Sequence, residues 1–585
     1  MKYSMMGFAE KAIMPDYPVD MIGFDRISNR SQGMLDPLMI QIAVFKMAGF
    51  QVLVTIDSLG FTIEKSRHLR LILAGYLKIS IDQVMICFSH THSAPNAYTE
   101  TAYYQMLCDQ AELTLQEACR NLQIVKAGWG LTEAVIGKNR RQTGKTDNRL
   151  GILKITDQQN QLKLLVMRVS AHANVLTSDN YRLSADYFGR TRQHLTALLH
   201  CPIMMIQGSA GDIRPLYQQD NAVYLEINAH LISQQDPDPK RIQQDFRQSQ
   251  AALDKMADTI CEAAVPIVET IRTDDNINIA MYSEELVFNA DVPTEAQAKQ
   301  IAEEARNQAG IDPTAWLKEV ASLHQQQLKT QSQSVEIQYF YLNNGCLCGT
   351  ANETMADTAL EIMAASGNPL VFFNGYTNGC TSYLANETEY DAGGYEVLWS
   401  NLLYFPYHRK VMPFNRDTVS RLISQTLMTL ETLPYLTKIK QKTVPEMTVL
   451  ADHHAVSLFH DELISQFTEN MQTELIRLKC KAIDFYTVFF VDAYRQTDYE
   501  LELWSIITEQ PLEKRRLIFK IIPASKVLYL FTEERPEQLR PLYNALFNYA
   551  KQQHWRLNGS PREHYRPSKR SATGYQTEIQ LPIKI

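Results

Sequence analysis

The sequence predicts an α/β protein in which sheets are covered by helices, followed by a separate C-terminal α+β domain. Three observations lead to this prediction. Short apolar runs alternate with amphipathic stretches over most of the chain. Several of these runs end in a histidine, a carboxylate or a tyrosine, which places a candidate metal site at the strand ends. The composition also changes near residues 437–447.

The bulk properties limit the classes of function. A chain of 585 residues is too long for one ordinary core, so we expect at least two domains. The formal charge of −8 gives no electrostatic reason to expect a nucleic-acid partner. No apolar run approaches the roughly 18 residues needed to span a bilayer, so we expect no stable membrane insertion.

The compartment follows from two further features. Glu10 and Lys11 interrupt the N-terminal stretch, which therefore lacks the apolar run of a secretory signal. The nine cysteines are scattered, mostly in apolar surroundings, as is typical of reduced thiols. We expect a cytoplasmic protein.

The predicted first domain covers residues 1–435. Buried strands are expected at 51–57, 84–89, 162–170, 202–208, 335–344 and 368–376, and helices at 101–122 and 185–199. The segment from about 220 to 330 is Gln-rich and is predicted to be mostly helical. Within it, Thr294 and Asp312-Pro313 are typical of helix N-termini.

The predicted second domain covers residues 442–585 and follows a linker, TKIKQKTVPEM. Its first strand, MTVLADHHAVSLF, is followed by a helix, DELISQFTENMQTELIRLK, and by a second strand, FYTVFFVDAY. Further strands are expected in ELELWSII, KVLYLF and TEIQLPIK, with a helix in LRPLYNALFNYAKQQH. This rhythm of strands and helices predicts a compact α+β unit.

Two histidines end the apolar run VMICF in the motif SHTHSAP, as His90 and His92. His172 follows another strand, and Glu353 lies at a strand-to-helix junction. Two neutral imidazoles and one carboxylate are sufficient to bind Zn²⁺ with an open coordination position. A histidine at a strand end is also often a structural, hydrogen-bonded residue, and spacing alone leaves both interpretations open.

The order of these motifs resembles the neutral/alkaline, non-lysosomal ceramidase family. HTHSAP is followed by Asn139-Arg140, the His172 segment with SADYFG, GSAGDIRP, ANETMADTALEI and the NG…SY…EY…GGYE run. Each motif is short, but the shared order covers roughly residues 5–410.

The resemblance implies a zinc-dependent hydrolase that cleaves the amide (N-acyl) bond of a small molecule with a metal-activated water. In the family pattern, the metal ligands correspond to His90, His172, Glu353 and Tyr383. A tyrosine ligand is chemically reasonable, because a metal ion favours the phenolate.

The resemblance also implies which residues contact the substrate. His92, Arg140 and Tyr395 correspond to the catalytic positions that hold the substrate carbonyl and the developing oxyanion. Backbone near Gly23 contributes to this site. Either His92 or Tyr395 is available to protonate the leaving amine.

One position departs from the family pattern. The turn reads Gly211-Asp212-Ile213-Arg214-Pro215, with Arg214 where ceramidases carry a serine. With Gly23, Asp212 and Arg214 complete the predicted substrate-binding set. Because arginine adds a fixed charge with a bidentate fork, we expect an anionic or carboxylate-bearing substrate. Ceramide itself is not expected, because ceramidases of this type are usually exported and carry a β-sandwich domain after the ceramidase body, and this sequence indicates neither feature. A surface arginine that pairs with Asp212 is the alternative.

The C-terminal domain resembles the effector-binding domains of AraC- and MerR-type regulators, which are also called gyrase-inhibitor-like. The motifs are Leu542-Tyr543, NGSPREHYRP and TEIQLPIK. The resemblance implies a pocket in which Glu563, beside Tyr565, attracts a cationic or aromatic ligand. The alternative is an exposed loop glutamate that pairs with Arg562 or Arg566. No helix-turn-helix precedes the domain, so DNA binding is not implied.

Three functions follow from these observations. A zinc-dependent amidohydrolase is the first. A catalytically silent small-molecule sensor that retains a structural zinc ion is the second, and a zinc-dependent ester hydrolase is the third.

Overall fold

The computed structural model describes residues 4–26, 28–47, 49–141, 144–218, 239–458, 461–490, 497–508, 516–535, 538–567 and 575–584. The chain divides into two compact units, Met1–Leu427 and Met428–Ile585. No helix among the described residues is both long and apolar enough to cross a membrane.

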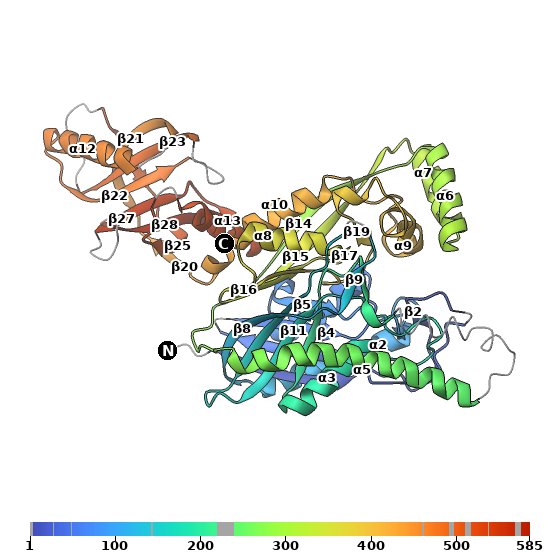
Figure 1. The fold of residues 1–585 in the computed structure, drawn as a ribbon. Helices are drawn as coiled ribbons and strands as arrows, with labels where there is room; N and C mark the ends of the chain where they lie inside the picture. The colour runs from blue at the N-terminus through green and yellow to red at the C-terminus, as the bar shows by residue number, and fades with distance from the viewer. Residues whose placement is uncertain are drawn as a thin grey trace. The chain divides into compact units, whose positions relative to one another are not determined.

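Three main sheets form the first unit (Figure 1). One has the order β5-β4-β3-β1-β7, with β1 Met5–Ala12, β3 Met39–Lys46, β4 Phe50–Ile56, β5 Val84–Phe88 and β7 Gln123–Ile124. The next has the order β12-β11-β10-β8, with β8 Lys126–Glu133, β10 Arg149–Thr156, β11 Leu162–Val169 and β12 Ile203–Gln207. The third has the order β14-β15-β16-β18, with β14 Ile279–Asp291, β15 Thr330–Leu342, β16 Gly345–Gly349 and β18 Val371–Asn374.

Short two-stranded ladders lie near the ends of these sheets. They pair β2 with β6, β9 with β13, and β17 with β19. Their bounds are β2 Met21–Ile22, β6 Ala94–Pro95, β9 Gly137–Asn139, β13 Ile213–Pro215, β17 Glu353–Thr354 and β19 Tyr383–Leu384. These ladders hold the chain extended where the candidate site residues lie.

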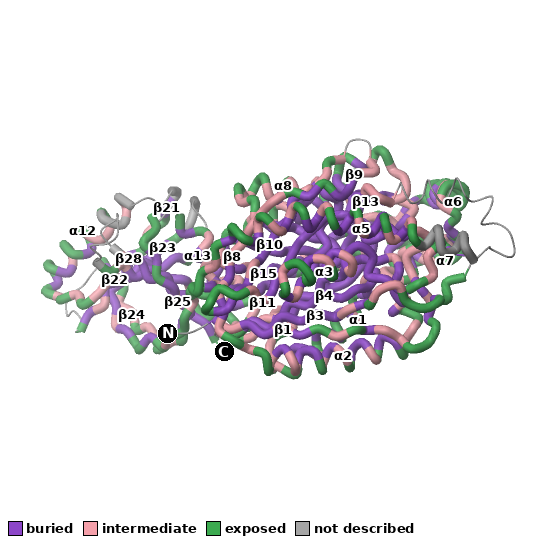
Figure 2. The backbone as a smooth tube through the Cα atoms, turned by 60° about the horizontal axis from the view of Figure 1, so that its bottom comes forward, coloured by how far each residue is buried: buried purple, intermediate pink, exposed green. Residues whose placement is uncertain are grey.

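Helices cover the outer faces of the sheets. α1 and α2 pack on the first sheet, and α3 and α5 pack on the second, where Figure 1 shows α5 running across the strands. The helices of this unit are α1 Ile63–Leu77, α2 Thr101–Arg120, α3 Asp186–Leu199, α5 Pro239–Thr270, α6 Glu295–Ala309, α7 Thr314–Gln325, α8 Ala356–Ser366, α9 Ser400–His408 and α10 Thr418–Leu430. Figure 2 shows buried strands inside and exposed outer helix faces.

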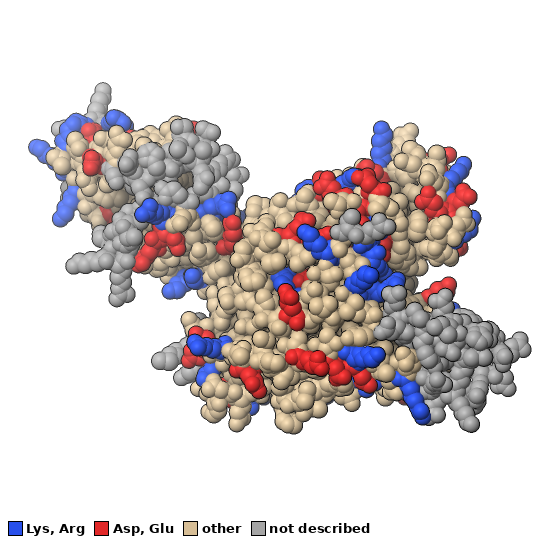
Figure 3. Space-filling model, in the orientation of Figure 1, with Lys and Arg blue, Asp and Glu red and all other residues tan. Residues whose placement is uncertain are grey.

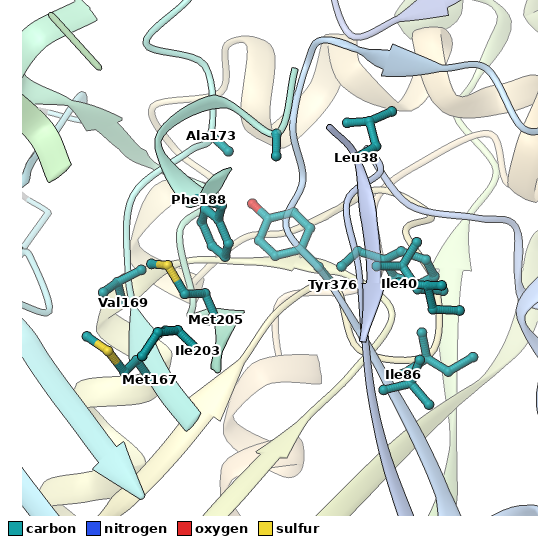
Figure 4. Close-up of a cluster of buried hydrophobic side chains, with 14 of the residues drawn as sticks. Leu38, Ile40, Ile86, Met167, Val169, Ala173, Phe188, Ile203, Met205 and Tyr376 are labelled. Carbon is teal, nitrogen blue, oxygen red and sulfur yellow. The ribbon is translucent and has the colours of Figure 1, made fainter. Parts of the chain in front are cut away.

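Alternate residues of each strand enter different cores, because successive side chains point to opposite faces. In β3, Ile40 and Ile42 pack toward the helices, whereas Ala43 and Phe45 join a second cluster between the sheets. Figure 4 shows part of the first cluster, in which the Tyr376 ring lies among apolar side chains such as Ile40 and Phe188. Helices and sheets therefore form layers, as the α/β prediction expects.

The described part of the Gln-rich segment is mostly helical, as expected, and it also contains the strand β14, which pairs along its whole length with β15. One segment differs from the sequence-based expectation. The expected linker contains a strand, β20 Lys440–Val444, which pairs with β25 Ser525–Thr532. β20 is paired with a segment distant in sequence, and this tertiary pairing outweighs its polar composition. The predicted N-cap Thr294 is confirmed, since it forms a capping box with Gln297.

The second unit contains a nine-stranded sheet with the order β20-β25-β28-β27-β22-β23-β21-β24, and β26 pairs with β28. Its remaining strands are β21 Met447–Leu458, β22 Ala482–Phe489, β23 Thr497–Ile507, β24 Ile518–Ile522, β26 Arg556–Leu557, β27 Arg562–Pro567 and β28 Tyr575–Lys584. Its helices are α11 Leu433–Leu436, α12 Asp461–Arg477 and α13 Arg540–Gln552. Residues 491–494 of the expected strand FYTVFFVDAY lie outside the described residues.

Candidate metal centre

His90 follows β5 by two residues and is almost completely buried. Its backbone has a positive φ of 58°, which is uncommon outside glycine and turns the chain sharply after the strand. The Nδ1 atom lies 2.7 Å from the carbonyl oxygen of Leu59. Because a carbonyl can only accept a hydrogen bond, Nδ1 carries a proton, and Nε2 is the ring nitrogen that faces Glu353.

His172 repeats this arrangement after β11. Its Nδ1 atom lies 2.6 Å from the carbonyl oxygen of Ala210, so the same tautomer is fixed. Burial is the largest cause that lowers the pKa of His172, to about 4. The ring is therefore neutral near pH 7, and its Nε2 is an acceptor.

Glu353 and Tyr383 meet across the ladder of β17 and β19. The two residues are paired in parallel register, and the Glu353 amide donates to the Ser382 carbonyl at 2.9 Å. Gly211 lies against this ladder, since a Cβ there would stand 2.7 Å from the Glu353 carbonyl oxygen. A glycine is thus required for the turn after β12 to approach the ladder.

The two imidazoles point at one carboxylate oxygen. Glu353 Oε2 lies 3.2 Å from His90 Nε2 and 3.3 Å from His172 Nε2. Burial alone would raise the pKa of Glu353, but the two histidines hold it well below its ordinary value. At these distances the three atoms repel one another unless a positive species, either a proton or a metal ion, lies between them.

Two tyrosines that the sequence reasoning missed donate to the same carboxylate. Tyr404 Oη donates to Glu353 Oε1, and Tyr376 Oη donates to Oε2 at 3.3 Å. The Tyr376 ring also packs on His90, with ring centroids 4.2 Å apart. Tyr376 directly follows the strand run VFFNG and could have been found by the strand-end rule, whereas Tyr404 lies in α9 without any motif.

Arg140 connects the predicted ligands to the predicted catalytic residues. Its Nη2 atom donates to Tyr383 Oη at 3.2 Å and to the Gly211 carbonyl at 2.6 Å. Its Nε atom lies 3.0 Å from Glu396 Oε1, so its charge is paired. Burial and the charge of Glu353 raise the pKa of the Tyr383 phenol, which therefore keeps its proton unless a cation is bound nearby.

His92 lies beside the other two histidines. Its ring centroid is 5.1 Å from that of His90 and 5.6 Å from that of His172, and neither ring nitrogen has a hydrogen-bond partner among the described residues. Burial lowers its pKa well below the ordinary value. The ligand atoms of all three histidines lie within 4.8 Å of one another, close enough to hold one metal ion.

Gly23 and Phe24 cover the other side of the His92 ring. Gly23 has a φ of 111°, and a Cβ there would stand 2.8 Å from Cα, Cβ and Cγ of His92. Phe24 packs on the imidazole with ring centroids 4.8 Å apart. Gly23 thus lies directly against His92, where no larger residue fits.

A cavity of about 280 Å³ opens onto this cluster. It is lined by Phe24, His92, Arg140, His172, Asn174, Arg214, Gln218, Tyr383 and Tyr395. Asp212 is not among the lining residues. Its carboxylate accepts hydrogen bonds from the Ala356 amide at 2.9 Å and from Asn139 Nδ2 at 2.6 Å, so it fixes the start of α8 instead.

In the second unit, Glu563 is buried and accepts a hydrogen bond from Tyr543 Oη at 2.6 Å and another from Tyr565 Oη. Arg562 and Arg566 also lie in β27, where they alternate with Glu563 and Tyr565 and so point to the opposite face of the strand. Arg562 Nε donates to Gln580 at 2.8 Å, and Arg566 Nη2 donates to Glu578 at 2.6 Å. The alternative of an exposed loop glutamate is therefore wrong.

Comparisons with known proteins agree with both resemblances. A neutral ceramidase from Pseudomonas aeruginosa matches with a TM-score of 0.53 and 13% identity, over 100% of this chain and 99% of that one. A ceramidase complexed with C2 gives the same values. The chain has the neutral ceramidase fold. The family of GyrI-like small molecule binding domains matches residues 437–584. A search of curated proteins finds no significant match.

Proposed function

We propose that the first unit is a zinc-dependent hydrolase that cleaves the amide bond of a small N-acyl compound. The observation that carries this proposal is the convergence of His90 Nε2 and His172 Nε2 on Glu353 Oε2, with both Nδ1 atoms bonded to carbonyls. A proton between these acceptors is disfavoured at His172, whose pKa is lowered. A divalent cation satisfies all three acceptors.

The residues present fit zinc. Imidazole nitrogen and carboxylate oxygen are ordinary zinc ligands, and His90, His172, Glu353 and Tyr383 would hold the ion. The carbonyls behind the imidazoles and the phenols behind Glu353 orient these ligands, as is usual around metal sites. When bound, zinc polarises an amide carbonyl and lowers the pKa of water, which are the two requirements of hydrolysis.

Three residues of the chain would act on the substrate. His92, Arg140 and Tyr395 all line the cavity. The guanidinium of Arg140 is held by Gly211 and Glu396 and lines the cavity, so it would be preorganised for a developing oxyanion bound there. Such preorganised donors typically contribute about 2.7–4 kcal/mol each to the transition state.

The leaving amine needs a proton, and we propose Tyr395 as its donor. Burial raises the pKa of the Tyr395 phenol, which therefore retains its proton. Burial also lowers the pKa of His92, so its ring is neutral and carries a proton on only one nitrogen. His92 would then hold the carbonyl through its single N–H.

We also propose that the second unit binds a lipophilic or aromatic cation at Glu563. A buried carboxylate surrounded by Tyr543 and Tyr565 offers charge and ring faces to such a ligand. This site favours a second candidate function for the whole chain, that of a sensor in which the metal is structural.

Metal analysis and an activity screen separate these functions. We expect about one zinc per chain, and hydrolysis of short N-acyl amides that stops after chelation and returns with zinc. His90→Ala should lose both metal and activity. His92→Ala should lose activity but keep the metal; loss of zinc would make His92 a ligand instead. Zinc binding without turnover of any amide would support the sensor, and turnover of esters alone would support an esterase.

A further inference from the structure

We propose that the substrate carries a carboxylate, which Arg214 and Lys138 bind at the mouth of the cavity. This inference rests on the proposed amide hydrolysis and adds the class of compound that is cleaved. Arg214 lies in β13 and lines the cavity that contains His92, Arg140 and Tyr395. A group held there is in the same cavity as the candidate catalytic residues.

A second cation stands directly beside Arg214. β13 pairs with β9 in antiparallel register, and Arg214 is opposite Lys138. Directly opposed residues project to the same face, with Cβ atoms about 4.5–5.5 Å apart. Both side chains are exposed. Like charges opposed in this way destabilise a ladder, unless an anion is bound between them.

The charge of this pair is not neutralised by the neighbouring acids. Among the described residues, neither Lys138 nor Arg214 has an ion pair or a side-chain hydrogen bond. Asp212, the expected partner of Arg214, is buried and binds Ala356 and Asn139. Arg140, the other cation that lines the cavity, is already paired with Glu396. In Figure 3, Lys and Arg side chains gather at the place where Figure 1 labels β9.

A carboxylate suits this pair best. The guanidinium fork of arginine matches the two oxygens of a carboxylate, and lysine adds a point charge. The cavity of about 280 Å³ has room for a small amide whose polar end remains at the mouth. The compound expected is therefore an N-acyl amino acid or a similar amide acid.

Matched compounds test this inference. N-Hexanoylglycine is compared with its uncharged primary amide and with a phosphonate analogue, using kcat/KM for hydrolysis. Binding is measured separately by calorimetry with N-(hexylsulfonyl)glycine and its primary amide, which lack a scissile carboxamide at that position. The variants are Arg214→Gln, Lys138→Gln and, as a control, Lys299→Gln, an exposed cation of α6 outside the cavity.

We expect the wild-type protein to prefer the carboxylate over the neutral amide in both measurements. Arg214→Gln should reduce this preference by about fivefold to twentyfold and Lys138→Gln by a smaller factor, and added salt should weaken it, because both cations are exposed. Lys299→Gln should leave it unchanged.

Three results would overturn the inference. They are equal binding of acid and amide by the wild-type protein, a preference untouched by Arg214→Gln, and stronger recognition of the phosphonate than of the carboxylate. Failure of the proposed hydrolysis can be distinguished from failure of the proposed carboxylate recognition. Selective binding of the sulfonyl acid that depends on Arg214, without turnover of any amide, would support carboxylate recognition and contradict the hydrolase.

Discussion

Glu353 is the residue on which the interactions of the site converge. Its side chain is completely buried, and it contacts two imidazoles and two phenols from four separate segments of the chain. An isolated buried carboxylate would be costly, so this position is sustained only by its partners. The phenols donate to part of the carboxylate, and a cation between its Oε2 atom and the two imidazole Nε2 atoms would neutralise the rest.

Glu353→Gln should therefore abolish stable zinc binding. The amide keeps the shape of the side chain but removes its negative charge, and we expect at least about a hundredfold weaker affinity, as even the loss of a residue that only supports a ligand costs tenfold to hundredfold. Competition with a zinc chelator measures this change. Glu361→Gln, an exposed glutamate of α8, is the matched control. Unchanged zinc affinity in Glu353→Gln would exclude this carboxylate as a ligand.

Tyr404→Phe tests the support of the ligand. Removal of the hydroxyl leaves Glu353 Oε1 without this donor, so we expect zinc affinity to fall by about tenfold to hundredfold while the fold is retained. The same chelator titration gives the affinity, and circular dichroism shows whether the fold persists. A variant that binds zinc like the wild-type protein would show that Tyr404 does not orient the ligand.

At the scale of elements, strand ends were the part of the site that the sequence could predict. Continuous apolar runs that end just before His90 and His172 predicted both strands and the position of the histidines at their ends, and β5 and β11 follow those runs closely. Glu353 and Tyr383 could be predicted only from the resemblance to the ceramidase family, because their ladder has two residues in each strand and gives no periodic signal. Tyr404 could not be predicted, since only tertiary packing brings α9 to the carboxylate.

The same reason explains the errors outside the site. β20 is stabilised by β25, a strand distant in sequence, whereas its own residues are largely polar. The position of Asp212 in the GDIRP turn predicted that its side chain contacts the substrate. The structure instead uses this turn to begin α8, since the Asp212 carboxylate bonds to the Ala356 amide.

The connection between Asp212 and α8 predicts a pH dependence of stability. Burial raises the pKa of Asp212 from 3.8 to about 6. The folded state therefore holds this proton at pH values where the unfolded state has lost it. The stability contributed by Asp212 is present below about pH 4 and is lost as the pH rises through about 6, a change on the order of 2–3 kcal/mol.

Urea unfolding of the wild-type protein and Asp212→Asn between pH 4 and 7 measures this effect. Because asparagine does not titrate, the unfolding free energy of the wild-type protein should fall relative to that of Asp212→Asn as the pH rises. Asp391→Asn is a control without a pH dependence in this range, since the hydrogen bond from Arg416 lowers the pKa of that exposed carboxyl and the change in stability falls below about pH 4. A difference for Asp212→Asn that is constant with pH would contradict the raised pKa.

At the scale of the whole molecule, the chain combines a unit of ceramidase fold with a GyrI-like unit. The sequence motifs predicted this combination, because each unit carries several short motifs in a fixed order. The motifs do not predict how ligands of one unit affect the other. The two candidate sites can, however, be tested independently.

Glu563→Gln should remove cation binding from the second unit. Tetraphenylphosphonium, a lipophilic aromatic cation, is a suitable probe, and we expect its affinity to fall by at least about tenfold when the buried charge is lost. Fluorescence titration of the full chain measures binding, and Glu533→Gln, an exposed glutamate, is the matched control. Zinc content should not change. Equal affinity in the Glu563→Gln and wild-type proteins would place cation binding elsewhere.

X-ray diffraction from crystals of the zinc-loaded protein, recorded on both sides of the zinc absorption edge, tests the central claim most directly. One anomalous peak should lie within about 2.0–2.2 Å of His90 Nε2, His172 Nε2 and a Glu353 oxygen. The Tyr383 hydroxyl should complete the ligand set. A zinc-loaded crystal in which these atoms surround no peak, or in which zinc is bound only elsewhere, would contradict the account.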